Sequence, residues 1–549
     1  MKIVIPMSGM GNRFVEAGYT APKPLIEIDG MPIIDHVVHM FPLEEDFIFI
    51  CNSKHLKETN MRAILQRIAP KGKIVEIPPH KKGPVYAVQY VENLVDDEEE
   101  VIVNYCDFSC YWDYADFLAH TRSRDADGAV PAYKGFHPHM LGTTNYAFMR
   151  DEKQWMLEIK EKEPFTDNRM QEYASIGMYY FKKGAYVKKY FKELMEQDIN
   201  LNGEYYVSLI YNLLVNDGLK VSIYDIQHML QWGTPQDVEE YNGFSDYFRA
   251  VCNEEVNTEI HKETGINLIP LAGLGSRFYK EGYVDPKPLI SVSGKPMIVQ
   301  AANYLPKAPT NIFVCLEDHL KDYPLESNIK ITYTDAKIVS LNKTTEGQAC
   351  TCEIGLKDVD SNSPLLIAAC DNGMLFDKVK YKELLNDSSV DAIAWSFRNH
   401  PSSERNPEMY GWIKTDENNT VTGVSVKKAI SDTPRKDHAI VGTFYFRKTS
   451  YFLEALSRLY EKNIRVNGEF YVDSCLNELV EMNLNVKVFE IDHYIGWGTP
   501  NDYKTFVYWQ SFFHKVDWHP YRLEKDITVK VSEIASLDKE YSQFNQEWR

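Results

Sequence analysis

The sequence predicts an α/β protein made of two Rossmann-like domains in tandem, each with a mixed and mostly parallel sheet. Short apolar runs alternate with amphipathic segments, a pattern typical of right-handed βαβ units. The stretch IPMSGMGNRFVEAGYTAPKPLI at residues 5–26 returns as IPLAGLGSRFYKEGYVDPKPLI at residues 269–290. A chain of 549 residues is also too long for a single hydrophobic core.

Hydrophobic periodicity predicts the same order of elements in both copies. In the first copy we expect strands at residues 2–6, 46–51, 73–78 and 99–106, with helices at 54–69 and 84–95. In the second copy we expect strands at 266–271, 311–315, 329–333 and 364–370, with a helix at 348–356. Ligands of such sheets bind outside the carboxyl ends of the strands, where both glycine loops fall.

The register of the repeat sets the expected domain boundaries. Lys23 matches Lys287 and Asp107 matches Asp371, both at an offset of 264 residues (371 − 107), which becomes 265 further along the chain. This period is far longer than a solenoid repeat of about 20 to 50 residues. We therefore expect domains at 1–242 and 265–510, a linker at 243–264, and an aromatic-rich extension at 511–549 that packs as helix on the second domain.

Composition narrows the classes of function. The net charge of −19 argues against a nucleic-acid partner, because binding to a phosphate backbone needs a basic surface. Apolar runs stay well below the roughly 20 residues of a membrane span, and the N-terminal segment enters a glycine loop where a signal peptide would carry an apolar region. With nine scattered cysteines, the sequence predicts a cytoplasmic protein with buried free thiols. It leaves the oligomeric state open.

Each copy places a glycine loop directly after its first strand. The loops contain Gly9, Gly11 and Arg13 in the first copy and Gly273, Gly275 and Arg277 in the second. Such a loop brings backbone N–H groups against a phosphate, although a tight turn without a ligand would also use these glycines. Ten residues later, PKPLI places Lys23 and Lys287 between two prolines, which hold one ammonium on a stiff segment. The two motifs together predict a phosphate site in each half.

The motif GxGxRF followed by PKPLI resembles the signature of the sugar-phosphate nucleotidyltransferases. The resemblance covers about residues 1–242 and 265–510, and is greatest to a bacterial branch associated with capsule and surface-polysaccharide genes. It implies a core shared with GT-A glycosyltransferases. It also implies a reaction of a nucleoside triphosphate with a small phosphorylated substrate, which releases pyrophosphate and leaves a nucleotide-activated product.

The resemblance also implies roles for residues that match the family pattern. Mg²⁺ would bind Asp107 in the first domain and Asp371 in the second. Arg13, Lys23, Arg277 and Lys287 would hold the triphosphate and offset charge on the leaving pyrophosphate. Backbone groups near Gly83 and Gly347 would contact the nucleobase, with Lys82 standing where the second copy has Glu346.

On the substrate side the family pattern is only partly kept. The matching residues are Glu161 and Lys162 in the first domain and Lys427 and Lys428 in the second, with Val426 in place of the family's acid. Glu204 and Glu469 begin helices, where they would either contact substrate or only cap the helix. The family's second metal aspartate is replaced by Gln231 and Gly496. Asp492 is a candidate substitute in the second domain, which makes the first domain the more doubtful catalyst.

Two rival functions remain open. A GT-A glycosyltransferase shares the core but normally holds its metal through Asp-x-Asp, and neither Asp107-Phe108-Ser109 nor Asp371-Asn372-Gly373 has the second acid. Alternatively, one or both domains could only sense nucleotides or hold the partner domain. Neither the phosphorylated substrate nor the nucleobase can be read from the sequence.

Overall fold

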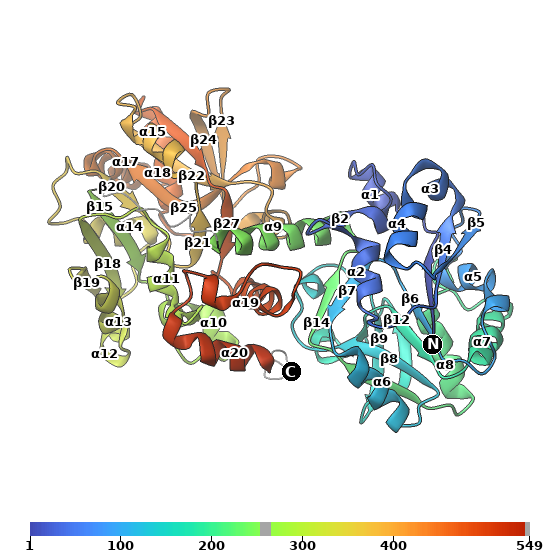
Figure 1. Cartoon of the computed structure of the whole chain (residues 1–549). Helices are drawn as coiled ribbons and strands as arrows, with labels where there is room; N and C mark the ends of the chain where they lie inside the picture. Colours follow the sequence, from blue (N-terminus) through green and yellow to red (C-terminus); the bar gives the residue numbers. More distant parts are fainter. Residues whose placement is uncertain (253–264, 544–549) are drawn as a thin grey trace. The chain divides into compact units, whose positions relative to one another are not determined.

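The computed structural model describes residues 1–252 and 265–543 (Figure 1). The chain divides into two compact units. The first unit is Met1–Asn242 with Val516–Trp518 and the C-terminal residues from Tyr541, and the second is Gly243–Lys515 with His519–Glu540. Both units are α/β, as the sequence predicts, and each is built around one large mixed sheet.

The sheet of the first unit has ten strands in the order β11-β9-β10-β13-β8-β12-β6-β1-β4-β5. The pairs β6-β1, β1-β4, β4-β5 and β13-β8 are parallel, and the other pairs are antiparallel. The strands are β1 Lys2–Met7, β4 Phe47–Asn52, β5 Lys73–Ile77, β6 Val101–Asn104, β8 Gly128–Tyr133, β9 Ala147–Glu152, β10 Trp155–Glu161, β11 Tyr173–Ser175, β12 Met178–Phe181 and β13 Val221–Asp225. The sheet is therefore parallel around β1, where the glycine loop begins, and antiparallel over most of the rest.

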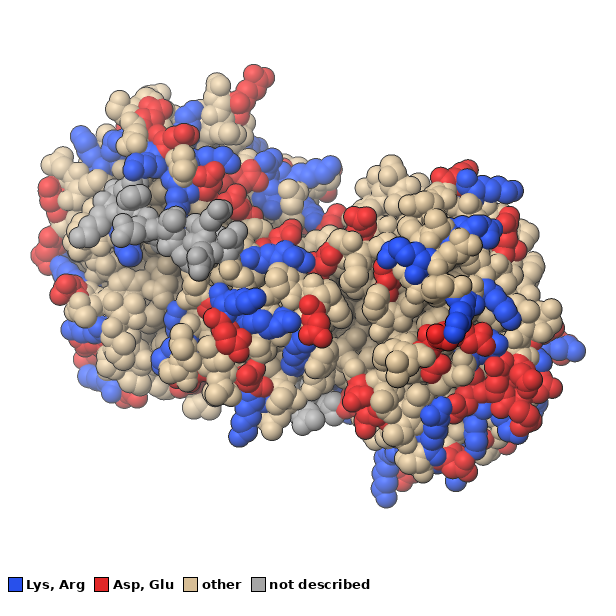
Figure 2. Space-filling view, in the orientation of Figure 1, with Lys and Arg blue, Asp and Glu red and all other residues tan. Residues whose placement is uncertain are grey.

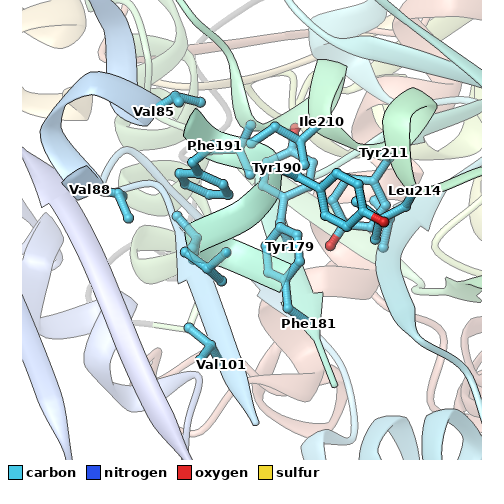
Figure 3. Packing of buried hydrophobic residues seen from close by; sticks show 14 of the residues in the cluster. Val85, Val88, Val101, Tyr179, Phe181, Tyr190, Phe191, Ile210, Tyr211 and Leu214 are labelled. Atoms are coloured by element: carbon cyan, nitrogen blue, oxygen red, sulfur yellow. The ribbon is translucent and has the colours of Figure 1, made fainter. Parts of the chain in front are cut away.

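Successive residues of the parallel strands face opposite sides of the sheet, so a strand covered on both sides must be apolar throughout. β1 is buried along its whole length, which explains the run KIVIPM. One side forms a core with α5, α7 and α8. Figure 3 shows Tyr179 and Phe181 of β12 meeting Phe191 of α7 and Tyr211 of α8, with the Phe181 and Tyr211 rings 5.2 Å apart.

The helices of the first unit follow the predicted order with two differences. The helix expected at 54–69 is split in two because Thr59 is extended, with φ −136° and ψ 172°. The helix expected at 84–95 ends early and is followed by a 3-10 turn at Glu92–Leu94. The helices are α1 Asn12–Glu16, α2 Ile33–His39, α3 Ser53–Glu58, α4 Met61–Ile68, α5 Gly83–Gln89, α6 Tyr114–Ser123, α7 Gly184–Glu196 and α8 Val207–Asn216.

The segment predicted as a linker, 243–264, begins as helix. α9 runs from Pro235 to Val251, because Phe244, Tyr247, Phe248 and Val251 recur at helical spacing and are all buried. The polar composition of this stretch suggested a loop, but its apolar residues form one face of a helix. The rest of the predicted linker, residues 253–264, lies outside the described residues.

The sheet of the second unit follows the order β19-β18-β15-β20-β25-β22-β26, with β23 paired to β24 and β25. The pairs among β19, β18, β15 and β20 are parallel, as is β22-β26, and the others are antiparallel. The strands are β15 Ile266–Leu271, β18 Thr310–Leu316, β19 Lys337–Leu341, β20 Leu365–Ile367, β22 Ala392–Phe397, β23 Gly411–Thr415, β24 Val421–Val426, β25 His438–Phe446 and β26 Val486–Glu490.

The strand predicted at residues 329–333 is wrong. These residues fall mainly in helix α13, Leu325–Thr332, in which Ile329 is buried and Ile331 is 79% exposed. The strand in this position is β19, whose sequence is KIVSL. The other helices of the second unit are α10 Ser276–Lys280, α11 Met297–Asn303, α12 Glu317–Asp322, α14 Gln348–Gly355, α15 Lys378–Asn386, α16 Pro401–Arg405, α17 Thr449–Lys462 and α18 Val472–Glu481.

The C-terminal aromatic segment continues the last helix of the repeat. α19 spans Pro500–Lys515, so residue 511 does not start a new element. Phe513 packs on Phe248 within the second unit, with ring centroids 5.6 Å apart, whereas Trp518 packs against His36 within the first unit at 5.4 Å. The last described helix is α20, Ile534–Ser542.

Charged side chains of both signs are interspersed on the face shown in Figure 2. Among residues 1–252 and 265–543, no helix is both long enough and apolar enough to cross a membrane.

Candidate active site

The glycine loop and the proline-flanked lysine pack directly on each other in both units. Gly11 has φ +65°, and a Cβ added to it would lie 3.7 Å from the Cβ of Lys23. The equivalent Gly275 has φ +61°, and a Cβ there would come within 2.9 Å of the Cβ of Lys287. The left-handed backbone favours glycine at both positions, and at Gly275 the close contact leaves no room for a Cβ. The two sequence motifs therefore form one structural unit.

Each proline-flanked lysine contacts the aspartate that the sequence predicts as the metal ligand. The Nζ of Lys23 donates a hydrogen bond to Oδ2 of Asp107 over 2.8 Å, and Lys287 donates to Asp371. Burial alone would lower the pKa of Lys23, but the charge and hydrogen bond of Asp107, together with Cys106, outweigh burial and raise the net pKa. Lys287 and Asp371 show the same balance and a raised lysine pKa. Both lysines therefore stay charged at neutral pH.

Two short strand pairs hold these aspartates in place. β7 Phe108–Tyr111 follows Asp107 and pairs with β14 His228–Gln231, and the backbone N–H of Trp232 donates to the carbonyl of Asp107 over 2.9 Å. In the second unit β21 Asn372–Leu375 pairs with β27 His493–Gly496, and Trp497 donates to the carbonyl of Asp371 over 2.8 Å. Trp232 and Trp497 each begin a WGTP motif, at residues 232–235 and 497–500. This motif thus closes each site from a distant part of the sequence.

Asp492 does not join this site. It precedes β27, and β21 and β27 are antiparallel, with Asn372 opposite Gly496 and Leu375 opposite His493. Asp492 therefore lies at the end of the strand pair away from Asp371, beside Asp377, Lys380 and Glu490. Its predicted role as a substitute metal ligand rested on sequence proximity to the WGTP motif, which the direction of the strand reverses.

A different acid, Asp502, approaches Asp371. Asp502 stands in the first turn of α19, where its carboxylate accepts a hydrogen bond from Thr499 over 2.7 Å. Burial raises the pKa of Asp502, and the negative charge of Asp371 raises it further. Asp502 carries no distinctive signal in the sequence, because Thr-x-x-Asp is also the pattern of an ordinary helix cap, which is formed here too.

A cavity of about 590 Å³ in the first unit brings the predicted residues together. Every site residue predicted for the first unit lines it, namely Gly9, Gly11, Arg13, Lys23, Gly83, Asp107, Glu161, Lys162 and Glu204. Its wall also contains residues that the sequence analysis did not select, including Ser8, His80, Asn145 and Tyr206. The Ser8 hydroxyl and the His80 ring lie 2.9 Å apart beside the glycine loop. Ser8 belongs to the repeated stretch at residues 5–26, and only the fold brings it together with His80, Asn145 and Tyr206.

Gly83 and Gly347, predicted at the base-contacting segment, permit a close crossing of two chain segments. A Cβ at Gly83 would lie 2.7 Å from the backbone N and O of Tyr205, and one at Gly347 would lie 2.5 Å from the carbonyl of Phe470. The crossing is closed by a hydrogen bond from the N–H of Val85 to the carbonyl of Tyr205 over 3.1 Å. These glycines therefore hold the NGE loops, residues 202–204 and 467–469, against the start of α5 and α14.

Glu161 ends strand β10 and Lys162 follows it, and both residues line the cavity. Lys162 has φ +60°, a strained conformation for a non-glycine residue, and Lys427 has the same value in the second unit. The Nζ of Lys162 donates to the Tyr206 hydroxyl over 2.7 Å, and that hydroxyl donates to Glu204. Glu161 accepts from Ser208 over 2.6 Å, and burial raises its pKa.

The second unit gathers most of its predicted residues in the same way. Lys427 donates to the carbonyl of Met409, and its pKa is lowered by burial against the opposing charges of Asp473, Asp371 and Glu469. Arg277 lies within electrostatic range of both Lys287 and Lys427. Lys428 is exposed, as are Arg277 and Glu469.

Comparisons with known proteins find relatives among the nucleotidyltransferases. Residues 2–205 match the family model described as nucleotidyl transferase. Over 186 residues the chain is 26% identical to the mannose-1-phosphate guanylyltransferase catalytic subunit beta of Danio rerio, which spans 33% of this chain and 49% of that protein. Over 56 residues it is 41% identical to the glucose-1-phosphate cytidylyltransferase of Salmonella typhimurium, or 10% of this chain and 22% of that one. The chain thus matches half or less of the length of these curated relatives.

Among solved structures, a nucleoside-diphosphate-sugar pyrophosphorylase from Vibrio cholerae RC9 superposes with a TM-score of 0.37 at 23% identity, covering 44% of this chain and 98% of that one. In both units the site consists of a glycine loop packed on a lysine–aspartate pair. The family model matches residues 2–205, and the relatives found by sequence are sugar-phosphate nucleotidyltransferases.

Proposed function

We propose that the protein transfers a nucleoside monophosphate from a nucleoside triphosphate to a phosphorylated sugar or similar small phosphorylated substrate, with release of pyrophosphate. The observation that carries the proposal is the cavity in which Gly9, Gly11, Arg13 and Lys23 face Lys162. Two anions must meet in this reaction, and the cavity has cationic groups on both of its walls. A phosphate oxygen of the substrate attacks the α-phosphorus, and the bond from this phosphorus to pyrophosphate breaks.

The chain's own residues have distinct parts in this proposal. N–H groups of the glycine loop and the side chain of Arg13 bind the triphosphate, while Lys23 offsets charge on the leaving pyrophosphate. Lys162 binds the phosphate of the second substrate, and Glu161 accepts hydrogen bonds from its hydroxyls. The corresponding residues of the second unit are Arg277, Lys287 and Lys427, with Lys428 at the margin, and Glu469 beside the substrate.

The donor set at the aspartates suits Mg²⁺, which commonly takes one or two carboxylates and completes its shell with phosphate oxygens and water. In residues 1–252 and 265–543 no group of three or more His, Cys, Asp or Glu side chains gathers into a complete metal cage. Asp107 in the first unit, and Asp371 with Asp502 in the second, would hold the ion. When bound, it would neutralise charge on the triphosphate.

Support is strongest for the first unit, because the family match lies there and its cavity contains every residue predicted for it. From the sequence, the first unit was expected to be the more doubtful catalyst, because it lacks the family's second metal aspartate. The support for the proposal is nevertheless greater for this unit. The second unit keeps the lysine–aspartate contact and is proposed to act as well. A cytoplasmic location and a role in surface-polysaccharide precursor synthesis remain part of the proposal and rest on the sequence resemblance alone.

The test uses the full chain, Mg²⁺, and pairs of ATP, CTP, GTP, UTP or dTTP with hexose 1-phosphates or phosphocholine, and measures released pyrophosphate. We expect release that falls in D107N or D371N and disappears in the double variant. D97N, which removes an exposed carboxylate paired with Lys188, is the matched control and should keep full activity. Release that persists in the double variant would contradict the proposed sites.

A further inference from the structure

The acid that faces the substrate lysine comes from different elements in the two units. In the first unit it is Glu161, the last residue of β10, and it accepts a hydrogen bond from Ser208 on α8. In the second unit the strand position holds Val426, the last residue of β24, and the helix position holds Asp473 on α18. The offset of 265 joins both pairs (426 − 161 and 473 − 208). Where one unit has a carboxylate on the strand and a hydroxyl on the helix, the other has valine and a carboxylate.

The strand pairs show that these positions are structurally equivalent. Glu161 lies opposite Ala147 in the β10-β9 pair, and Val426 lies opposite Gly411 in the β24-β23 pair. Ser208 and Asp473 are each the second residue of their helix. The exchange therefore moves the acid across one site, from the strand to the helix that faces it.

Gly411 makes room for the relocated acid. A Cβ at Gly411 would lie 2.3 Å from Oδ2 of Asp473, a distance that no real side chain could keep. The Asp473 carboxylate therefore occupies space directly above the strand pair, and the residue is 9% exposed. In the first unit the equivalent Ala147 keeps its methyl group, and the helix there carries the smaller Ser208. Three positions thus differ together, which fits the relocation of one carboxylate.

Asp473 also faces the remaining charges of the second site. Among the charged groups around Lys427, Asp473 has the largest effect on the lysine pKa, followed by Arg277, Asp371 and Glu469. Burial raises the pKa of Asp473 to about 6, against the opposing effect of Lys427. A carboxylate held out of water beside one lysine retains hydrogen-bonding capacity toward a ligand.

We propose that Asp473 is the substrate-recognition carboxylate of the second unit, in the place that Glu161 has in the first. With Lys427 it recognises a small phosphorylated compound that carries a hydroxyl or ammonium donor near its phosphate. The acid is shorter by one methylene and approaches from the helix, so it meets that donor at a different point. The two units therefore select different phosphorylated substrates. This inference rests on the proposed function of the second unit.

The test measures pyrophosphate release by the second unit alone, in full-length protein carrying D107N, with the nucleotide and substrate panel described above. We expect D473N to raise KM for the phosphorylated substrate by about ten- to a hundred-fold, the worth of a hydrogen bond to a charged group. KM for the nucleotide should change less than about two-fold, which loss of packing alone would not achieve. V426E/D473S, which restores the arrangement of the first unit, should favour the substrate that the first unit prefers.

Several outcomes separate this inference from the function on which it rests. If D371N abolishes release in the D107N background but D473N leaves KM unchanged, Asp473 does not recognise substrate and the inference fails alone. An equal rise in both KM values, or the same substrate preference in both units, would also overturn it. If the D107N protein releases no pyrophosphate with any pair, the catalytic role of the second unit fails, and the inference fails with it.

Discussion

Replacing each loop glycine by alanine should affect the two units unequally. Both Gly11 and Gly275 have positive φ, so alanine costs about 1 to 2 kcal/mol in either loop through backbone strain. At Gly11 the new methyl would lie 3.7 Å from Lys23, an ordinary contact. At Gly275 it would lie 2.9 Å from Cβ of Lys287, and overpacking adds about 1 to 3 kcal/mol. G275A should therefore cost about 2 to 5 kcal/mol and G11A about 1 to 2.

Hydrogen exchange of peptides covering each loop measures these local free energies in the whole protein. Activity gives a second measurement, with G11A studied in the D371N background and G275A in the D107N background. Because G275A must push Lys287 away from its glycine loop, it should reduce kcat/KM by about a hundred-fold, the effect of misplacing a group by about 1 Å. G11A should cost clearly less. Equal effects of the two substitutions on exchange and on activity would refute the packing argument.

Three further predictions follow from the same contacts. K23M should lower kcat of the first unit by about a hundred- to a thousand-fold in the D371N background, because the leaving pyrophosphate loses a fixed charge partner. Because burial raises the pKa of Asp473 from 3.8 to about 6, the folded state favours its protonated form, and this contribution to stability is lost as pH rises toward 6. D473N should therefore raise the free energy of unfolding at pH 7.5 by up to about 3 kcal/mol, seen as a higher melting temperature. This increase in stability should vanish near pH 4, and an increase that does not change with pH would contradict the reasoning. G347A should open helix α14 to hydrogen exchange, because its methyl would meet the carbonyl of Phe470 at 2.5 Å, whereas G468A, with open space around it, should cost only the backbone strain.

The sequence was sufficient for features that depend on local chemistry. A glycine with positive φ and a lysine between prolines have few conformations, so their side-by-side packing could be expected from the motifs. The buried parallel strands could be expected for the same reason, since few other elements carry unbroken apolar runs. Residues Ile329 to Tyr333 show the limit. Five residues with alternating apolar positions fit a strand, but here they form the end of a half-exposed helix.

Features that depend on the direction of distant elements could not be read from the sequence. Asp492 is close to the WGTP motif in the chain, yet the antiparallel pairing of β21 and β27 places it at the end of this strand pair away from Asp371. Asp473 is distant from Val426 in the sequence, yet it lies in the same site. The strand has valine in place of the acid, and only the packing of α18 shows which residue replaces it. Both outcomes depend on which side chains share a site, which a single sequence does not give.

The strand pair β7-β14 determines how short a working first unit can be. The family match ends at residue 205, but β14 begins at His228 and leads into the backbone contact that holds Asp107. β13, Val221–Asp225, also completes the sheet beside β8. A fragment cut at residue 205 would keep every predicted charged group and lose the clamp behind its central carboxylate. The smallest independent catalyst should therefore extend at least into α9.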